Sequence, residues 1–187
     1  MLRTLPNLLT GFRLVAAPGV ALAFAALPRP EADALAAALF LLAAVTDWAD
    51  GRLARALGAI TPWGRMMDPI ADKAMVTIAL ATLMMLTGPD WRVVVPAAAI
   101  MLRETAVSGL REFLAGRVEA PVTRLAKWKT AVQMAALFAL LLAGAAGPAP
   151  LLSGLGLAAL WLAAALTVWT GADYFRRALA DPAAKEP

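Results

Sequence analysis

The sequence predicts an all-α, polytopic membrane protein with six transmembrane helices and an N-terminal interfacial amphipathic segment. Hydrophobic residues make up 61% of the 187 residues and charged residues only 16%, against roughly 45–50% and about 25% in ordinary soluble domains. Six segments approach the roughly 20 apolar residues that a helix needs to cross a bilayer. The chain is therefore expected to form one integral membrane domain, residues 1–187, with no room for a soluble domain.

The six predicted spans follow one another through the chain. They cover roughly residues 8–27, 32–49, 74–91, 93–114, 130–147 and 151–172. Each break carries glycine or proline, which favour turns over a continued helix; in order the breaks are LPRPEAD, LGAITPWG, TGPDW, AGRVEAPVTR and AGAAGPAP. Because most connections are short, neighbouring spans should run antiparallel.

The residues before the first span carry the pattern of a helix that lies along the membrane surface. Leu5, Leu8, Leu9 and Phe12 fall on one face of a helix in TLPNLLTGFR. An amphipathic helix buries such a face at the membrane interface. A cleaved signal peptide is the alternative, because two arginines accompany an apolar run at this end of the chain.

Basic residues predict the orientation in the membrane. Of the 17 lysines and arginines, only Arg29 and Arg92 fall in the connections after the first, third and fifth spans. Loops rich in Lys and Arg stay in the cytoplasm, so both termini are expected there. The formal net charge of +4 fits anionic lipid better than nucleic acid, because the basic residues form no stripe.

The composition also restricts the chemistry. Cysteine and histidine are both absent, which excludes thiolate and imidazole catalysis, disulfides and the usual zinc sites. Catalysis therefore has to use Asp, Glu, Lys, Arg or hydroxyl groups.

Four aspartates gather where the second span ends and the third approaches. Asp47 and Asp50 are three residues apart and Asp68 and Asp72 are four apart, so each pair shares one helix face. Antiparallel neighbours would bring the two pairs together. Carboxylates at such close range need a compensating positive charge, which nearby basic residues or metal ions could supply. Oxygen ligands suit magnesium, manganese or calcium, and two such ions could clamp a phosphoryl group.

The plainer interpretation is that these aspartates are charges at helix ends, paired with nearby arginines. That interpretation suits any single aspartate, but it gives little reason for a cluster of four acids, since topology depends on positive residues. A metal-ion transporter with these aspartates as its path is a further alternative. The acids lie toward one face of the membrane and the second half of the chain has no counterpart, which disfavours it.

The aspartates belong to a longer pattern. Eight residues match D-x2-D-G-x2-A-R-x8-G-x3-D-x3-D: Asp47, Asp50, Gly51, Ala54, Arg55, Gly64, Asp68 and Asp72. This pattern resembles the signature of the CDP-alcohol phosphatidyltransferases. LPNLLTGFR, LRETAVSGLREF and KWKTAVQM resemble the bacterial branch that makes phosphatidylglycerophosphate, so the resemblance extends over nearly the whole chain. One departure is Ala126, where that branch usually has glycine.

The resemblance implies an enzyme of the bacterial cytoplasmic membrane, normally a homodimer, with its active site on the cytoplasmic side. It would transfer a phosphatidyl group from CDP-diacylglycerol to sn-glycerol 3-phosphate and release CMP. Two divalent cations, Mg or Mn, would be held by Asp47, Asp50, Asp68 and Asp72, with Asp72 also acting as general base. Contacts with the CDP-diacylglycerol head group would come from Asn7, Thr10, Gly51, Arg55, Thr61 and Gly64.

The acceptor would be recognised through its phosphate. Arg103 and Arg111 are eight residues apart, slightly more than two helical turns, and Lys127 and Lys129 follow in the next span. These four residues are expected to bind glycerol phosphate, since guanidinium and ammonium groups bind phosphate well. The alternative is that the arginines pair with glutamates in their own helix. Sibling enzymes with inositol phosphate, serine or phosphatidylglycerol as acceptor also remain open.

Overall fold

The described residues, 5–57, 61–114 and 124–180 of this computed structural model, contain six α-helices and no strand. All six are long and apolar enough to cross a membrane, which confirms the predicted all-α, six-span architecture. In order they are α1 (Leu5–Ala26), α2 (Glu31–Leu57), α3 (Pro62–Thr87), α4 (Trp91–Leu114), α5 (Arg124–Ala145) and α6 (Pro150–Ala180).

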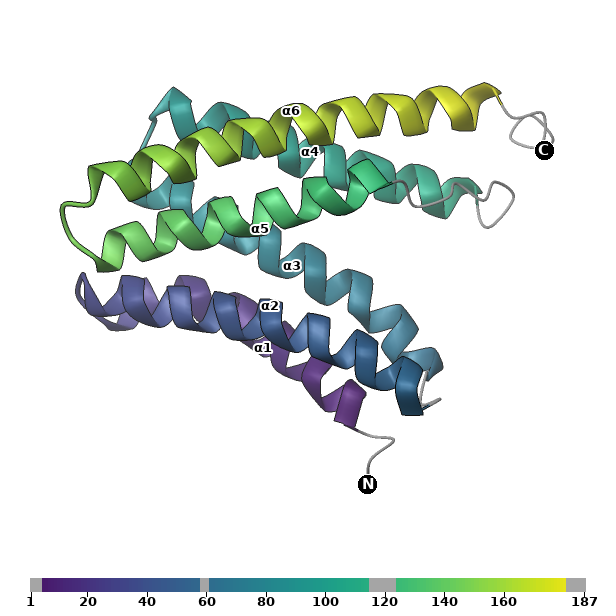
Figure 1. The fold of residues 1–187 in the computed structure, drawn as a ribbon, viewed down its shortest axis with the longest axis horizontal. Helices are drawn as coiled ribbons and strands as arrows, with labels where there is room; N and C mark the ends of the chain where they lie inside the picture. The colour runs from purple at the N-terminus through teal and green to yellow at the C-terminus, as the bar shows by residue number, and fades with distance from the viewer. Residues whose placement is uncertain (1–4, 58–60, 115–123, 181–187) are drawn as a thin grey trace.

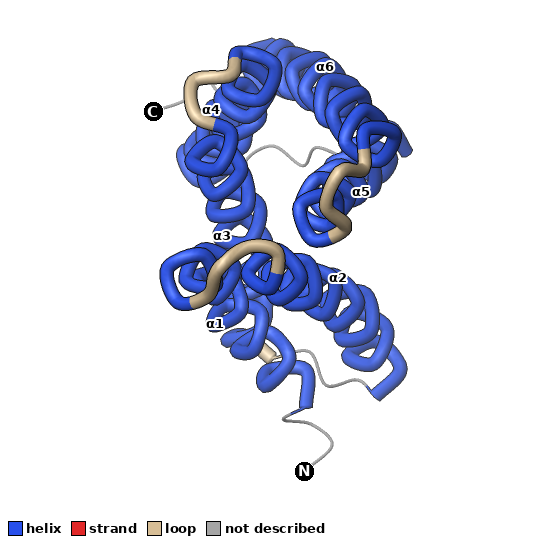
Figure 2. The backbone as a smooth tube through the Cα atoms, turned by 90° about the vertical axis from the view of Figure 1, so that its left-hand side faces the viewer, coloured by secondary structure: helices blue, strands red, loops and turns tan. Residues whose placement is uncertain are grey.

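Consecutive helices run antiparallel. The start of α1 and the end of α6 therefore lie at the same end of the bundle (Figure 1). The helices α1 and α2 form one pair and α5 and α6 form another; the two pairs meet where α2 packs against α5, and α3 packs against α1 and α4 (Figure 2). Seen along the bundle, α4 packs beside α6 on the side away from α1 (Figure 2).

Several helices extend beyond the predicted spans. The helix α2 continues from residue 49 to Leu57, and α3 begins at Pro62 rather than near residue 74. Thr61 caps the start of α3, because its hydroxyl accepts a hydrogen bond from the Gly64 N–H at 3.0 Å, and proline suits the first position of a helix. The aspartate motif therefore lies at the end of α2 and the start of α3, within two continuous helices.

The structure does not show a separate interfacial segment at the N-terminus. Residues from Leu5 onward continue as one helix. Leu8 and Phe12 are exposed at 66% and 38%, as lipid-facing side chains would be, whereas Thr10 and Arg13 are buried at 2% exposure each. The start of α1 thus places its polar side toward the bundle and its apolar side outward.

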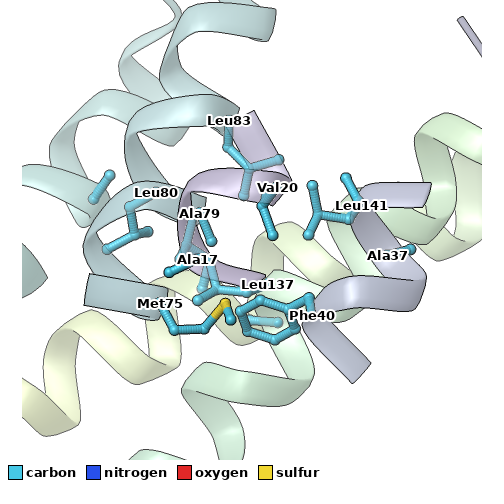
Figure 3. Close-up of a cluster of buried hydrophobic side chains, with 14 of the residues drawn as sticks. Ala17, Val20, Ala37, Phe40, Met75, Ala79, Leu80, Leu83, Leu137 and Leu141 are labelled. Carbon is cyan, nitrogen blue, oxygen red and sulfur yellow. The ribbon is translucent and has the colours of Figure 1, made fainter. Parts of the chain in front are cut away.

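Small and branched apolar side chains form the core. Ala17 and Val20 of α1, Phe40 of α2, Ala79 of α3 and Leu137 of α5 meet there (Figure 3). Alanine at such contacts lets helix backbones approach closely, which is how helices pack where water does not drive them together.

An ion pair within the α1–α2 pair lies where α5 packs against it, at the end of the bundle away from the aspartate motif. Arg29 donates to Asp33 through Nε at 2.6 Å and through a terminal nitrogen at 2.8 Å, and Asp33 is only 1% exposed. A Cβ added to Gly144 of α5 would lie 2.0 Å from Asp33 Oδ1. The missing side chain at this position is what lets α5 cover the ion pair, beside a cavity of about 640 Å³.

Candidate active site

Three of the four predicted aspartates converge on one arginine. Asp47 of α2 and Asp68 and Asp72 of α3 all accept hydrogen bonds from the guanidinium of Arg13 in α1. The distances are 2.5 Å to Asp72 and 3.1 Å to Asp68. Arg13 is 2% exposed, whereas the side chains of Asp47, Asp68 and Asp72 are 50%, 45% and 55% exposed. The positive charge thus lies inside, and the carboxylates surround it and remain open to water.

Sequence reasoning did not identify Arg13 as a site residue, because an arginine near a chain terminus is typical of a membrane flank. A signal was nevertheless present. Asn7, Thr10 and Arg13 recur every three residues, which places three polar side chains along one side of an otherwise apolar helix.

The residues expected to contact the nucleotide lie beside the aspartates. Thr10 donates to Asp68 Oδ1 at 2.7 Å, and Thr61 donates to Asn7 Oδ1 at 2.8 Å. Gly64 fits closely against both, since an added Cβ would lie 3.2 Å from the Asn7 oxygen and 3.2 Å from the Thr61 hydroxyl. The start of α1 and the start of α3 are therefore joined through polar side chains next to Asp68.

Some predicted residues lie outside the described side chains. Asp50, Gly51 and Arg55 belong to α2, and Lys127 belongs to α5, but the structure describes only their backbone. Within the part of the chain whose side chains are described, no three carboxylates are grouped as they would be around a metal ion. The Arg13 guanidinium lies between Asp47, Asp68 and Asp72 instead.

Two of the predicted acceptor residues are brought together by a glutamate. Glu104 of α4 accepts from Lys129 of α5 at 2.5 Å and from the adjacent Arg103 at 3.1 Å. All three side chains are at least four-fifths buried. Arg103 also donates to Thr170 of α6 at 3.2 Å, and an added Cβ at Gly171 would lie 2.7 Å from Arg103 Cγ. The cluster is thus held between α4, α5 and α6.

Arg111 is not part of this cluster. It is exposed, and its guanidinium carbon lies 5.9 Å from the centre of the Tyr174 ring, a cation–π distance. The alternative of pairing with a glutamate in the same helix holds for Arg103, which pairs with Glu104.

Buried polar atoms without partners lie close by. Gln133 is one helical turn beyond Lys129 on the same side of α5, and Thr167 is one turn before Gly171 on α6. Arg103 Nε, Gln133 Oε1 and Thr167 Oγ1 are buried and have no hydrogen-bond partner among the described residues. Buried polar groups are nearly always hydrogen-bonded, so these atoms point to water or a ligand between the helices.

Comparison with known proteins identifies a family whose model matches most of this chain. The model of the CDP-alcohol phosphatidyltransferase family matches residues 3–169. The chain is 44% identical to CDP-diacylglycerol--glycerol-3-phosphate 3-phosphatidyltransferase of Cereibacter sphaeroides, with 94% of this chain and 96% of the relative covered. The protein of the same name from Pectobacterium atrosepticum is 43% identical, with 95% and 96% covered. Cardiolipin synthase (CMP-forming) of Oryza sativa subsp. japonica is 40% identical over 94% of this chain and 57% of the relative.

Proposed function

Since this chain belongs to the CDP-alcohol phosphatidyltransferase family, we propose that it transfers a phosphatidyl group from CDP-diacylglycerol to sn-glycerol 3-phosphate. The bacterial relatives with 44% and 43% identity carry that activity in their names and match this chain almost end to end. The observation that carries the proposal is the convergence of Asp47, Asp68 and Asp72 on one positive charge. A site that gathers carboxylates around a cation suits a reaction on a diphosphate.

The donor set fits divalent cations. Three carboxylate oxygens of described residues accept hydrogen bonds from the Arg13 guanidinium, and carboxylate oxygens are the ligands that magnesium and manganese prefer. Two such ions, held by Asp47, Asp68 and Asp72 together with Asp50, would neutralise the negative charge of the diphosphate and of the departing CMP.

The protein's own groups position the reactants and take up the proton. Asn7, Thr10 and Thr61 would hold the head group against the start of α3, where Gly64 lets the Asn7 and Thr61 side chains lie close to the helix. The bond between the lipid phosphorus and the bridging oxygen of CMP breaks as a glycerol hydroxyl bonds to that phosphorus. The hydroxyl proton passes to the Asp72 carboxylate, a step for which general bases typically contribute about 10²–10⁴ in rate.

The cluster around Glu104 is the proposed site for the acceptor. Arg103 and Lys129 supply two positive charges for a phosphate, and Glu104 holds both. Gln133 Oε1 and Thr167 Oγ1 are buried and have no partner among the described residues; the amide oxygen could accept from a glycerol hydroxyl group, and the threonine hydroxyl could accept or donate. Arg111 and Lys127 remain candidates at the edge of this site.

The proposed orientation places the aspartates and both termini in the cytoplasm of a bacterium. Support comes from the opposite end of the bundle, whose three connections carry only Arg29 and Arg92 of the 17 lysines and arginines. The positive-inside rule then assigns that end to the outside. A homodimer completes the proposal on the basis of the family resemblance, and light scattering of the detergent-solubilised protein would measure its mass.

Phosphatidylglycerol is the second candidate acceptor, because the rice relative is named a CMP-forming cardiolipin synthase. The test is CMP release by the purified protein supplied with CDP-diacylglycerol, manganese or magnesium, and one acceptor at a time. We expect release with glycerol 3-phosphate, loss of release with EDTA and in Asp68→Asn, and unchanged release in the control Asp90→Asn at the other end of the bundle. Release of CMP with phosphatidylglycerol but not with glycerol 3-phosphate, or full activity in EDTA, would contradict the proposal.

A further inference from the structure

We propose that Arg13 is an internal cation that holds the aspartates together in the metal-free protein and has to leave them when divalent cations bind. This inference rests on the metal dependence proposed above and assigns to Arg13 the control of metal affinity. It begins from the position of the guanidinium, which bonds to carboxylates of two different helices.

The geometry makes Arg13 a competitor of metal ions rather than a bystander. One terminal nitrogen bonds to Asp47 and Asp72, and the other lies 3.1 Å from Asp68. The carboxylate oxygens that would coordinate a metal are therefore engaged by the guanidinium. A divalent cation among the same oxygens would lie within a few ångströms of that fixed positive charge, and like charges at such range repel strongly.

Burial explains why the guanidinium stays in place without metal. Arg13 is 2% exposed, and a buried arginine without anionic partners would carry a large desolvation penalty. The carboxylates are about half exposed, so ions can reach them from the water side. Metal binding then requires the minor state in which Arg13 has withdrawn, and apparent affinity falls in proportion to the population of that state.

The lipid substrate offers Arg13 a new partner. Its side chain lies on the same side of α1 as Thr10, which contacts Asp68, and Asn7, which contacts Thr61. A diphosphate bound at these residues would present oxygens that match the fork of a guanidinium. Arg13 could move from the aspartates to the diphosphate, so metal and lipid should each increase the affinity for the other.

The alternative is that Arg13 only fastens α1 to α2 and α3. The two roles predict opposite changes in metal affinity when Arg13 is replaced. If Arg13 is structural, its removal disperses the carboxylates and weakens metal binding. If Arg13 competes with the metal, its removal frees the oxygens and strengthens metal binding.

The experiment is a titration of the purified, detergent-solubilised protein with Mn²⁺, with free Mn²⁺ measured by electron paramagnetic resonance and no lipid substrate added. We expect Arg13→Gln to bind Mn²⁺ about tenfold more tightly or better, which corresponds to a withdrawn state populated at about 10% or less. The matched control Arg92→Gln, at the other end of the bundle, should bind as the wild type does. Unchanged or weaker binding in Arg13→Gln would overturn the proposal.

A second variant keeps the test decisive if Arg13→Gln does not fold. Arg13→Lys keeps the charge but has one terminal nitrogen in place of two, and it should tighten Mn²⁺ binding by a few-fold. An unchanged dissociation constant would overturn the proposal. Adding CDP-diacylglycerol should tighten binding in the wild type more than in either variant. Absence of Mn²⁺ binding in every protein would overturn the metal dependence itself, whereas equal binding in all of them would overturn only the role of Arg13.

Discussion

The substitution Gly144→Ala tests whether α5 packs on the Arg29–Asp33 ion pair so closely that only glycine fits at the contact. An added Cβ would lie 2.0 Å from Asp33 Oδ1, 2.6 Å from its Cγ and 2.7 Å from a terminal nitrogen of Arg29. Such distances are far below van der Waals contact, so the carboxylate or the helix has to move. Asp33 is 1% exposed, and it cannot move without losing its partner or opening the contact between α2 and α5.

The expected cost is about 2–4 kcal/mol of stability, between the usual cost of overpacking and that of breaking a buried ion pair. Thermal unfolding in detergent, followed by the fluorescence of the six tryptophans, measures it. In a chain of this length 1 kcal/mol corresponds to about 2–4 °C, so the midpoint should fall by at least about 4 °C.

A double-mutant cycle separates this cause from a general effect of alanine. In an Asp33→Ala background the carboxylate is gone and the added Cβ has room, so Gly144→Ala should cost much less there. An equal cost in both backgrounds would refute the reasoning. Activity of the folded fraction should persist, because Asp47 lies 14 residues along α2 from Asp33, about 21 Å away in a helix.

Three further outcomes follow from the site and from the outer connections. Asp72→Asn should retain binding of CDP-diacylglycerol but lose about 10²–10⁴ in turnover, which filter binding and CMP release measure separately. Lys129→Met should raise the KM for glycerol 3-phosphate far more than that for CDP-diacylglycerol, whereas Arg111→Ala should act weakly, because its guanidinium lies over Tyr174; equal shifts in both KM values would place Lys129 elsewhere. The side-chain hydrogen bond from Arg92 lowers the pKa of Asp90, so this pair stabilises the protein above the unfolded pKa of about 3.9 and ceases to do so as the pH falls through the folded value. Asp90→Asn should therefore lower the unfolding midpoint slightly at pH 7, and the difference from the wild type should shrink as the pH falls below about 3.9, which fluorescence melts over a pH series would detect.

Hydropathy was enough to predict the six helices but not their ends. A window of apolar residues finds the part of a helix inside the bilayer, and it stops at the first charges. The helix α2 continues through the aspartate motif to Leu57, and α3 begins at the Thr61 cap, because backbone hydrogen bonds and capping do not depend on hydrophobicity. The predicted spans therefore stopped short of the segments that carry the site.

The spacing of the aspartates predicted that they would meet. Residues three or four apart share one face of a helix, and antiparallel neighbouring helices bring two such faces together. Arg13 and Glu104 were missed as organisers, since the aspartates around Arg13 lie at least 34 residues away and Lys129 lies 25 residues from Glu104, and no local pattern encodes such pairs. The eight-residue spacing of Arg103 and Arg111 was misleading for a physical reason. Two turns of helix separate them by about 12 Å along the axis, enough for Arg103 to face Glu104 while Arg111 lies against Tyr174.

The ion pairs of Arg13 also bear on how the chain enters the membrane during synthesis. Its carboxylate partners follow 34, 55 and 59 residues later, so α1 leaves the ribosome well before any of them. In the orientation proposed above, the guanidinium has to stay at the cytoplasmic surface until α3 has emerged, since a charged residue deep in the bilayer costs several kcal/mol on insertion scales. The first helix is therefore expected to settle to its final depth only after the third has arrived.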